Sequence, residues 1–178
     1  MLDLLRDHGA RATFFVVGRH VEERPEVVRR AVAEGHELAN HTFDHVDAAY
    51  EKDDDVLRDQ IQRTSAAIEA VAGAPPRLIR PPYGKDVARV ARLGRELGLD
   101  HTVLWSAQGW DWDTTPADEI AELVLRDCAP GGIVVLHDGV PPRGGPSRAP
   151  MLIALADILA ALAGDGYELV TVSALLAA

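Results

Sequence analysis

The chain has 178 residues, of which 47% are hydrophobic and 26% are charged, a composition typical of a globular domain with a sizeable core. Its formal net charge of −10 argues against a nucleic-acid partner, because phosphate binding needs clusters of lysine and arginine that are missing here. No apolar run approaches the roughly 20 residues of a transmembrane helix. The single cysteine, Cys128, excludes an intrachain disulfide and a cysteine metal cluster.

The first residues show no basic segment followed by a long apolar core, so the sequence predicts no secretory signal at its start. Subcellular location and oligomeric state are left open by the chain itself.

Short β-rich runs alternate with amphipathic patterns along the whole chain. Strands are expected at residues 12–17, 37–39, 78–80, 101–105, 133–136 and 167–171. Helices are expected at residues 1–8, 25–34, 52–72, 86–97, 115–128 and 151–163, with Ser173 capping a last short helix. The continuous apolar run 12–17 is typical of a strand buried on both faces. Residues 139–150, rich in proline and glycine, predict a long loop.

This alternation predicts a parallel α/β fold in a single domain spanning residues 1–178. Six strands with intervening helices suit an open, distorted or incomplete (β/α) barrel. A doubly wound sheet is the alternative, but no glycine-rich phosphate loop follows a strand. The chain opens on a helix with no strand before it, so we expect that the first strand is missing and that the chain is N-terminally truncated.

His41 and His45 follow the strand expected at residues 37–39. Two histidines four residues apart can converge on one divalent ion, although a chance pair of loop histidines has the same spacing. The metalloprotease pattern His-Glu-x-x-His is excluded, because position 42 is threonine. Catalytic zinc usually has three protein ligands and a water molecule, so a third ligand must come from elsewhere.

Other polar residues also follow expected strands. Arg80 ends one, Asp111 lies beyond residue 105, and His137 comes directly after Leu136. Active sites of α/β barrels form at the carboxyl ends of strands, so these side chains would gather at one mouth. Each has a structural alternative, as a rim charge, a turn cap or a buried histidine, but together they favour a hydrolytic metal site.

Two tryptophans, Trp110 and Trp112, fit either the core or a platform that stacks on a sugar ring. The remaining histidines lie near helix ends or before strands, where a structural role is favoured: His8, His20, His36 and His101.

The sequence resembles the polysaccharide deacetylases of the NodB homology type, carbohydrate esterase family 4. Residues 41–45, His-Thr-Phe-Asp-His, match the family's His-(Ser/Thr)-x-x-His metal motif, and residues 80–84, Arg-Pro-Pro-Tyr-Gly, match its Arg-x-Pro-Tyr motif. Residues 111–112 match the end of Asp-x-x-Asp-Trp, with Gln108 in place of the first aspartate. Residues 135–137 match (Leu/Ile)-x-His with Val135 as the aliphatic, and residues 12–18 resemble the family's second strand.

The family's first motif, Thr-Phe-Asp-Asp, is absent from this chain. One of its aspartates is the family's third metal ligand and the other its catalytic base. Asp3 and Asp7 are poor substitutes, because both lie on the expected opening helix. We therefore expect the missing motif upstream of Met1.

The resemblance implies metal-dependent hydrolysis of N-acetyl groups from an amino-sugar polysaccharide such as peptidoglycan or chitin. It implies a divalent metal ion, with Zn²⁺ as the first choice and Co²⁺ or Ni²⁺ as alternatives. It also implies a location in the cell envelope or outside the cell, and a cytoplasmic location is left open. Its implied roles are metal binding by His41 and His45, catalysis by His137, Asp111, Arg80 and Tyr83, and lining of the acetyl pocket by Trp112 and Val135.

More specifically, His137 would be the general acid, oriented by Asp111, while Arg80 would keep the missing base ionised and the backbone N–H of Tyr83 would bind the oxyanion. Two alternatives remain open. One is a non-catalytic sugar-binding relative that lacks the base, and the other is an amidase acting on a small cyclic or linear amide.

Overall fold

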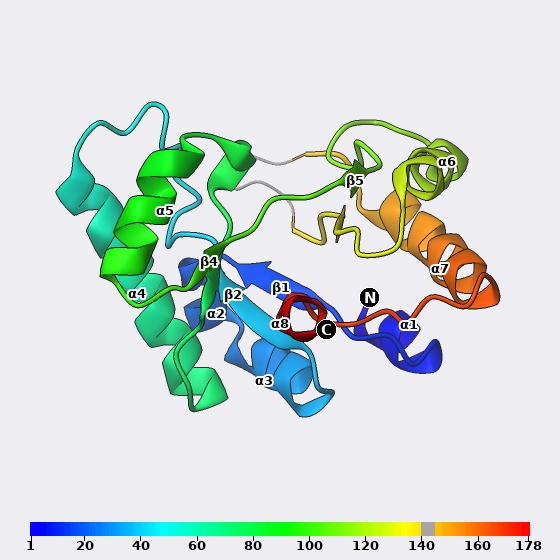
Figure 1. Cartoon of the computed structure of the whole chain (residues 1–178), viewed down its shortest axis with the longest axis horizontal. Helices are drawn as coiled ribbons and strands as arrows, with labels where there is room; N and C mark the ends of the chain where they lie inside the picture. Colours follow the sequence, from blue (N-terminus) through cyan, green and yellow to red (C-terminus); the bar gives the residue numbers. More distant parts are fainter. Residues whose placement is uncertain (140–144) are drawn as a thin grey trace. The chain divides into compact units, whose positions relative to one another are not determined.

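The computed structural model describes residues 1–139 and 145–178, and the chain divides into two compact units (Figure 1). One unit consists of residues Thr13–Leu104. The other consists of Met1–Ala12 together with Trp105–Ala178.

The Thr13–Leu104 unit is built on a four-stranded parallel sheet with the order β1-β2-β3-β4. The strands are β1 (Thr13–Val16), β2 (Glu37–Asn40), β3 (Leu78–Ile79) and β4 (His101–Thr102). Since the strands are parallel, their carboxyl ends meet at one edge of the sheet, and the segments carrying His41 and Arg80 leave from that edge.

Helices connect these strands: α2 (Gly18–Glu23), α3 (Pro25–Ala33), α4 (Asp54–Ala72), the 3₁₀ turn η1 (Pro82–Gly84) and α5 (Val87–Glu96). Pro25 occupies the first turn of α3, where its missing N–H costs nothing. The Asp53 side chain caps α4 by accepting from the Asp55 N–H, and Gly73 ends the helix in the left-handed conformation.

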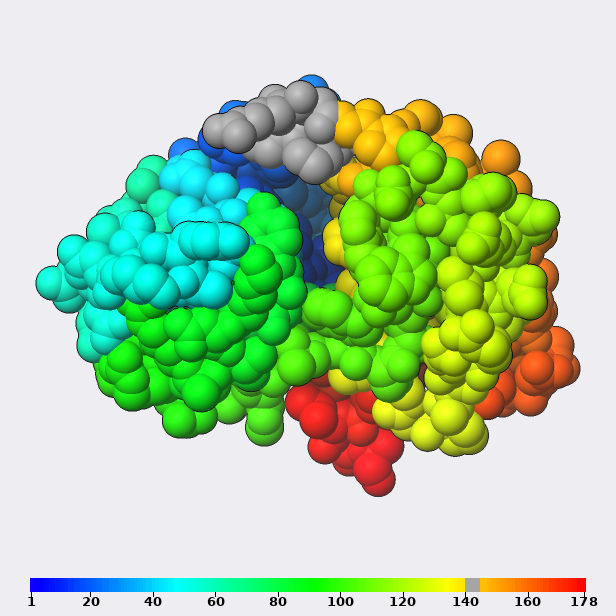
Figure 2. All heavy atoms as spheres, turned by 90° about the horizontal axis from the view of Figure 1, so that it is seen from above, coloured from blue at the N-terminus to red at the C-terminus, as the bar shows by residue number. Residues whose placement is uncertain are grey.

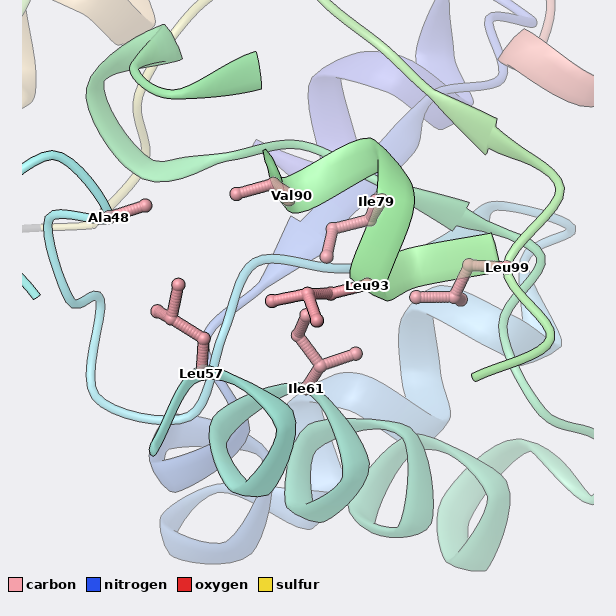
Figure 3. Close-up of a cluster of buried hydrophobic side chains, with 7 residues drawn as sticks. All are labelled: Ala48, Leu57, Ile61, Ile79, Val90, Leu93 and Leu99. Carbon is pink, nitrogen blue, oxygen red and sulfur yellow. The ribbon is translucent and has the colours of Figure 1, made fainter. Parts of the chain in front are cut away.

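The core of this unit lies where α4 and α5 pack on the sheet. Leu57 and Ile61 project from α4 toward Val90 and Leu93 of α5, with Ile79 of β3 behind them (Figure 3). All five side chains are almost fully buried. Burying an aliphatic side chain of this size contributes about 1.5–3 kcal/mol, so this cluster fixes both helices against β3.

The second unit contains a two-stranded parallel sheet of β5 (Ala107–Gln108) and β6 (Val134–Val135). Its helices are α1 (Leu2–Asp7), α6 (Ala117–Asp127), α7 (Ala149–Gly164) and α8 (Val172–Ala177). Helices α6 and α7 lie side by side and bury a common core of Ile120, Val124, Ala154 and Ile158 (Figure 1).

The parallel α/β architecture is confirmed, but individual strands differ from the prediction. Residues 167–171 form no strand; among the described residues, the backbone bond that links this segment to a distant part of the chain runs from the Arg11 N–H to the Leu169 carbonyl. The short strand β5 and the six-residue helix α2 were not predicted. Strand β1 is only half-buried, because it lies at the edge of the four-stranded sheet.

Two smaller predictions are also resolved. Ser173 does not cap the last helix, because Thr171 precedes it with extended backbone and accepts from the Ala174 N–H. Part of the predicted loop 139–150 lies outside the described residues, and α7 begins within it at Ala149. In the described parts of the chain, no helix is both long and apolar enough to cross a membrane.

Candidate functional site

The turn that carries the two histidines is fixed by buried Asn40 at the end of β2. The Asn40 side-chain amide donates to the Ile61 carbonyl (2.9 Å) and to the Ser65 hydroxyl (3.0 Å) on α4. Its Oδ1 accepts from the Thr42 N–H at 2.9 Å. Strand β2, helix α4 and the histidine turn are therefore tied together by one fully buried side chain.

The histidine turn packs closely against Gly18, the first residue of α2. A Cβ atom at that position would lie 2.5 Å from the Phe43 ring and 2.7 Å from the Thr64 hydroxyl. Glycine therefore lets the start of α2 approach the turn closely.

The His41 and His45 rings lie edge to face, with centroids 4.9 Å apart and their planes at 73°. His41 Nδ1 lies 2.7 Å from the Arg80 carbonyl oxygen, which accepts only if Nδ1 carries the proton. The imidazole lone pair is then on Nε2, as in histidines that bind metals through Nε2. The His45 ring also makes an edge-to-face contact with the Tyr83 ring, with centroids 4.8 Å apart.

Asp44 lies between the two histidines in the sequence but its carboxylate is bound elsewhere. It accepts from Gln60 Nε2 at 2.9 Å and lies 3.4 Å from Arg19 Nη1. The Asp44 N–H in turn donates to Gln60 Oε1 at 2.7 Å. These bonds fasten the turn to α4, so Asp44 has a structural role.

The donor set of the turn fits two imidazole ligands of a divalent metal. Within residues 1–139 and 145–178, no cluster of three or more histidine, cysteine, aspartate or glutamate residues has the arrangement of a metal site. The structure thus supports His41 and His45 as a pair and adds no third ligand from the described residues.

Arg80 lies buried at the end of β3. Its Nε donates to the Val103 carbonyl (3.2 Å) and its Nη2 to the Leu104 carbonyl (2.8 Å). Its guanidinium also stacks on the Phe15 ring, 4.0 Å from the centroid. Burial lowers the pKa of Arg80 to about 10, so the side chain keeps its charge at neutral pH. A positive charge is therefore fixed beneath the histidine turn.

Asp111 and His137, both in the second unit, form a close pair. Asp111 Oδ1 lies 3.0 Å from His137 Nδ1, and Asp111 Oδ2 accepts from the His137 backbone N–H at 2.5 Å. The Asp111 side chain is fully buried, whereas that of His137 is 40% exposed. The carboxylate orients the ring and leaves Nε2 as the atom that can exchange a proton with a substrate.

Arg148 holds the backbone on both sides of this pair. Its Nη1 donates to the Asp111 carbonyl (2.7 Å) and its Nε to the Gly139 carbonyl (2.8 Å), two residues after His137. Sequence analysis missed Arg148, because an arginine in a segment rich in proline and glycine carries no distinguishing signal.

The two tryptophans are not core residues: Trp110 is 50% exposed and Trp112 37%. Their ring centroids are 4.9 Å apart, and the Trp112 centroid lies 5.3 Å from that of His137. Val135 is buried in β6 and pairs in register with Gln108, whose Oε1 accepts from Trp105 Nε1 at 2.9 Å. Trp112 and Val135 thus both lie in the neighbourhood of the Asp111–His137 pair, within one unit.

Left-handed backbone conformations of non-glycine residues are concentrated near the candidate residues. Among the described residues they are Thr42, His45, Tyr83, Asp86 and Trp110. Such conformations cost about 1–2 kcal/mol for residues with a Cβ atom, and they persist where the surrounding structure imposes them.

Comparisons with known proteins agree with this geometry. The polysaccharide deacetylase family model matches residues 1–102. The chain is 40% identical over 175 residues to a chitooligosaccharide deacetylase of a Bradyrhizobium species, with 95% of this chain and 80% of the relative covered. It is 38% identical over 181 residues to a peptidoglycan-N-acetylglucosamine deacetylase of Bacillus cereus, with 99% and 80% covered.

Among solved structures, a CE4 family pseudoenzyme from Bacillus anthracis superposes with a TM-score of 0.87 at 28% identity. The alignment covers 98% of this chain and 58% of that chain. The chain therefore belongs to the polysaccharide deacetylase family, and its fold is the NodB-type α/β fold with an incomplete barrel.

Proposed function

We propose that this protein hydrolyses the N-acetyl group of an amino-sugar polysaccharide, releasing acetate and leaving a free amine on the sugar. The observation that carries the proposal is the Asp111–His137 pair, a buried carboxylate bound to a half-exposed imidazole in a member of this family. Two curated relatives are named for deacetylation of chitooligosaccharides and of peptidoglycan N-acetylglucosamine, and they support this substrate class.

His41 and His45 are proposed as two ligands of a divalent metal, Zn²⁺ in the first place and Co²⁺ or Ni²⁺ as alternatives. The closeness of the two rings and the Nδ1 contact of His41 support this role. When bound, such an ion lowers the pKa of water and polarises the acetamide carbonyl.

The other residues have separate roles in the proposal. His137 Nε2 donates the proton that the departing amine needs, and Asp111 stabilises the protonated ring and holds its orientation. The backbone N–H of Tyr83 binds the oxyanion that forms as water adds to the carbonyl.

Trp112 and Val135 line the acetyl pocket, and Arg80 keeps a catalytic carboxylate ionised. That carboxylate is expected from the family's first motif, which residues 1–178 do not contain. A polymeric glycan substrate would place the protein in the cell envelope or outside the cell.

Acetate release from chitin oligomers, peptidoglycan fragments and small cyclic amides tests the reaction and separates it from the amidase alternative. In a form of the protein to which the first-motif strand has been added back, we expect release from an amino-sugar oligomer, its loss on chelation and its recovery with Zn²⁺. Release from cyclic amides alone would replace the proposal with the amidase function.

A second function is favoured by one observation, the lack of a third metal-binding side chain beside His41 and His45 among the described residues. This second function is the binding of glycans without their hydrolysis. The structural neighbour from Bacillus anthracis is itself described as a pseudoenzyme. Saturable oligosaccharide binding with no acetate release at any metal concentration, even after the first-motif strand is added back, would establish this second function.

A further inference from the structure

Two exposed tyrosines lie on either side of Lys85, next to the histidine turn. Tyr50 is 79% exposed and Tyr83 is 60% exposed. Lys85 Nζ lies 5.2 Å from the Tyr50 ring centroid and 5.4 Å from the Tyr83 centroid. Because the Tyr83 ring also packs on His45, this tyrosine–lysine surface (Tyr50, Lys85 and Tyr83) is continuous with the proposed metal ligands.

The surface is held in place by Asp47. Its Oδ2 accepts from Lys85 Nζ at 2.8 Å, its Oδ1 from the Ala49 N–H at 3.0 Å, and its carbonyl from the Tyr50 N–H at 3.0 Å. The segment carrying Tyr50 is thus bonded to the lysine that follows η1. Such prior ordering lowers the entropy cost of binding a ligand.

Helix α5 also holds the segment that carries Tyr50, through Arg89. Arg89 donates to the carbonyl oxygens of Ala48 and Glu51 and pairs with Asp54. In the space-filling view the segment around residue 50 (cyan) lies directly against α5 (green) (Figure 2). Tyr50 is therefore exposed on a segment with several backbone contacts.

The chemistry of this surface suits a pyranose ring. Tyrosine offers a flat apolar face for the C–H face of a sugar and a hydroxyl at its edge. The Lys85–Asp47 pair offers donors and acceptors for sugar hydroxyls. Lys85, the cation of this surface, is already paired with Asp47 at 2.8 Å, so the surface offers no unpaired positive charge to a sugar carboxylate. This pairing favours an uncharged ring over one bearing a carboxylate.

We propose that Tyr50, Lys85 and Tyr83 form a subsite for an uncharged sugar ring next to the residue that is deacetylated. This inference rests on the proposed function, because it takes the glycan bound near His45 as its ligand. It extends that function by giving the protein a preference for oligomers over single sugars and for neutral neighbouring rings.

Calorimetric titration of the full chain with N-acetylglucosamine oligomers of one to six units tests the subsite. We expect the affinity to rise when a neighbouring ring is added, and Tyr50→Ala to weaken binding of the longer oligomers ~3- to 10-fold, the range that a stacked aromatic contributes. Tyr50→Phe should retain the affinity because it retains the ring. Val27→Ala, which removes an exposed apolar side chain from α3, is the control and should change nothing.

Charge preference is tested with a tetramer that alternates N-acetylglucosamine with N-acetylmuramic acid, whose lactyl group is anionic. At low salt it should bind more weakly than the neutral tetramer, and the difference should shrink in 0.5 M salt. Unchanged oligomer affinity in Tyr50→Ala, or no oligomer binding by the unmodified protein, would overturn the subsite. Binding that depends on Tyr50 but is never accompanied by acetate release would overturn only the proposed hydrolysis.

Discussion

The Asp111 carboxylate uses one oxygen to hold the His137 ring and the other to hold the His137 backbone. Position and orientation of the imidazole therefore depend on a single buried group. Their positions after expected strands predicted that both residues would lie at one mouth of the fold, and the family resemblance implied that Asp111 orients His137.

In a form of the protein that releases acetate, His137→Ala is expected to lower kcat by ~10²- to 10⁴-fold, the usual loss for a general acid, while sugar affinity changes little. Steady-state kinetics of metal-loaded protein on an N-acetylglucosamine oligomer measure both quantities. His101→Ala, at an exposed histidine that begins β4, is the control and should leave kcat unchanged. An equal loss in both variants would remove His137 from the reaction.

His41 and His45 are expected to bind Zn²⁺ weakly, because two neutral ligands lack the anionic third ligand of a complete site. Replacing both with alanine should abolish binding in a competition titration against a chromophoric chelator. The variant His8→Ala, His101→Ala removes two other histidines and should bind as the unmodified protein does. If both double variants bind zinc equally, the metal site is elsewhere.

The contacts of Arg80 show the limit of residue-level prediction. Its position after a strand is evident from the sequence, but its bonds to the Val103 and Leu104 carbonyls and its stacking on Phe15 depend on tertiary packing. The predicted pairing with a catalytic carboxylate stays a prediction.

At the scale of secondary structure, the histidine turn depends on the packing of β2 against α4. Asn40→Ala should lower the free energy of unfolding by about 1–3 kcal/mol, because it leaves the buried Thr42 N–H without its acceptor and cuts the link to α4. Urea denaturation measures the change. Ser65→Ala removes one bond of the same network and should cost less; an equal cost for both would show that Asn40 has no special role.

Long periodic helices were predictable because their apolar spacing reflects burial directly, as in α4 from Leu57 to Val71. The six-residue α2 was not, since it begins at Gly18 and its place is set by contact with Phe43. Residues 167–171 show the opposite error. Their apolar β-branched character resembles a strand, but a strand needs a bonded neighbouring strand. In the described part of the chain, the bond of this segment to a distant residue is the one from Arg11, and its other backbone bonds are local.

For the molecule as a whole, surface ion pairs offset part of its excess of acidic groups. Asp54 pairs with Arg89 and Arg92, each at 2.6 Å, and Asp47 pairs with Lys85. The hydrogen bond from Arg92 and then that from Arg89 lower the pKa of Asp54, and the bond from Lys85 lowers the pKa of Asp47.

Both carboxyl groups have a folded pKa below their ordinary value of 3.8, so the unfolded chain binds more protons as the pH falls. Their stabilisation is fully present well above pH 3.8 and is lost as the pH falls below it. Urea midpoints at pH 6 and pH 3 should therefore differ, and Asp54→Asn should reduce that difference. Because the pairs are exposed, 1 M salt should reduce it too. A pH 6 to pH 3 difference identical in Asp54→Asn and the parent would contradict the assignment.

The left-handed residues near the candidate site have a consequence for any search for heat-resistant variants. Replacing Thr42 or Trp110 by glycine relieves an unfavourable backbone geometry, and a thermal screen alone would favour such changes. The gain in thermal stability would come from changes in the turns that hold His41 and His45 or that carry Trp112 beside His137. Selection on melting temperature would thus tend to produce robust proteins with weakened sites, and glycan turnover would need to be selected at the same time.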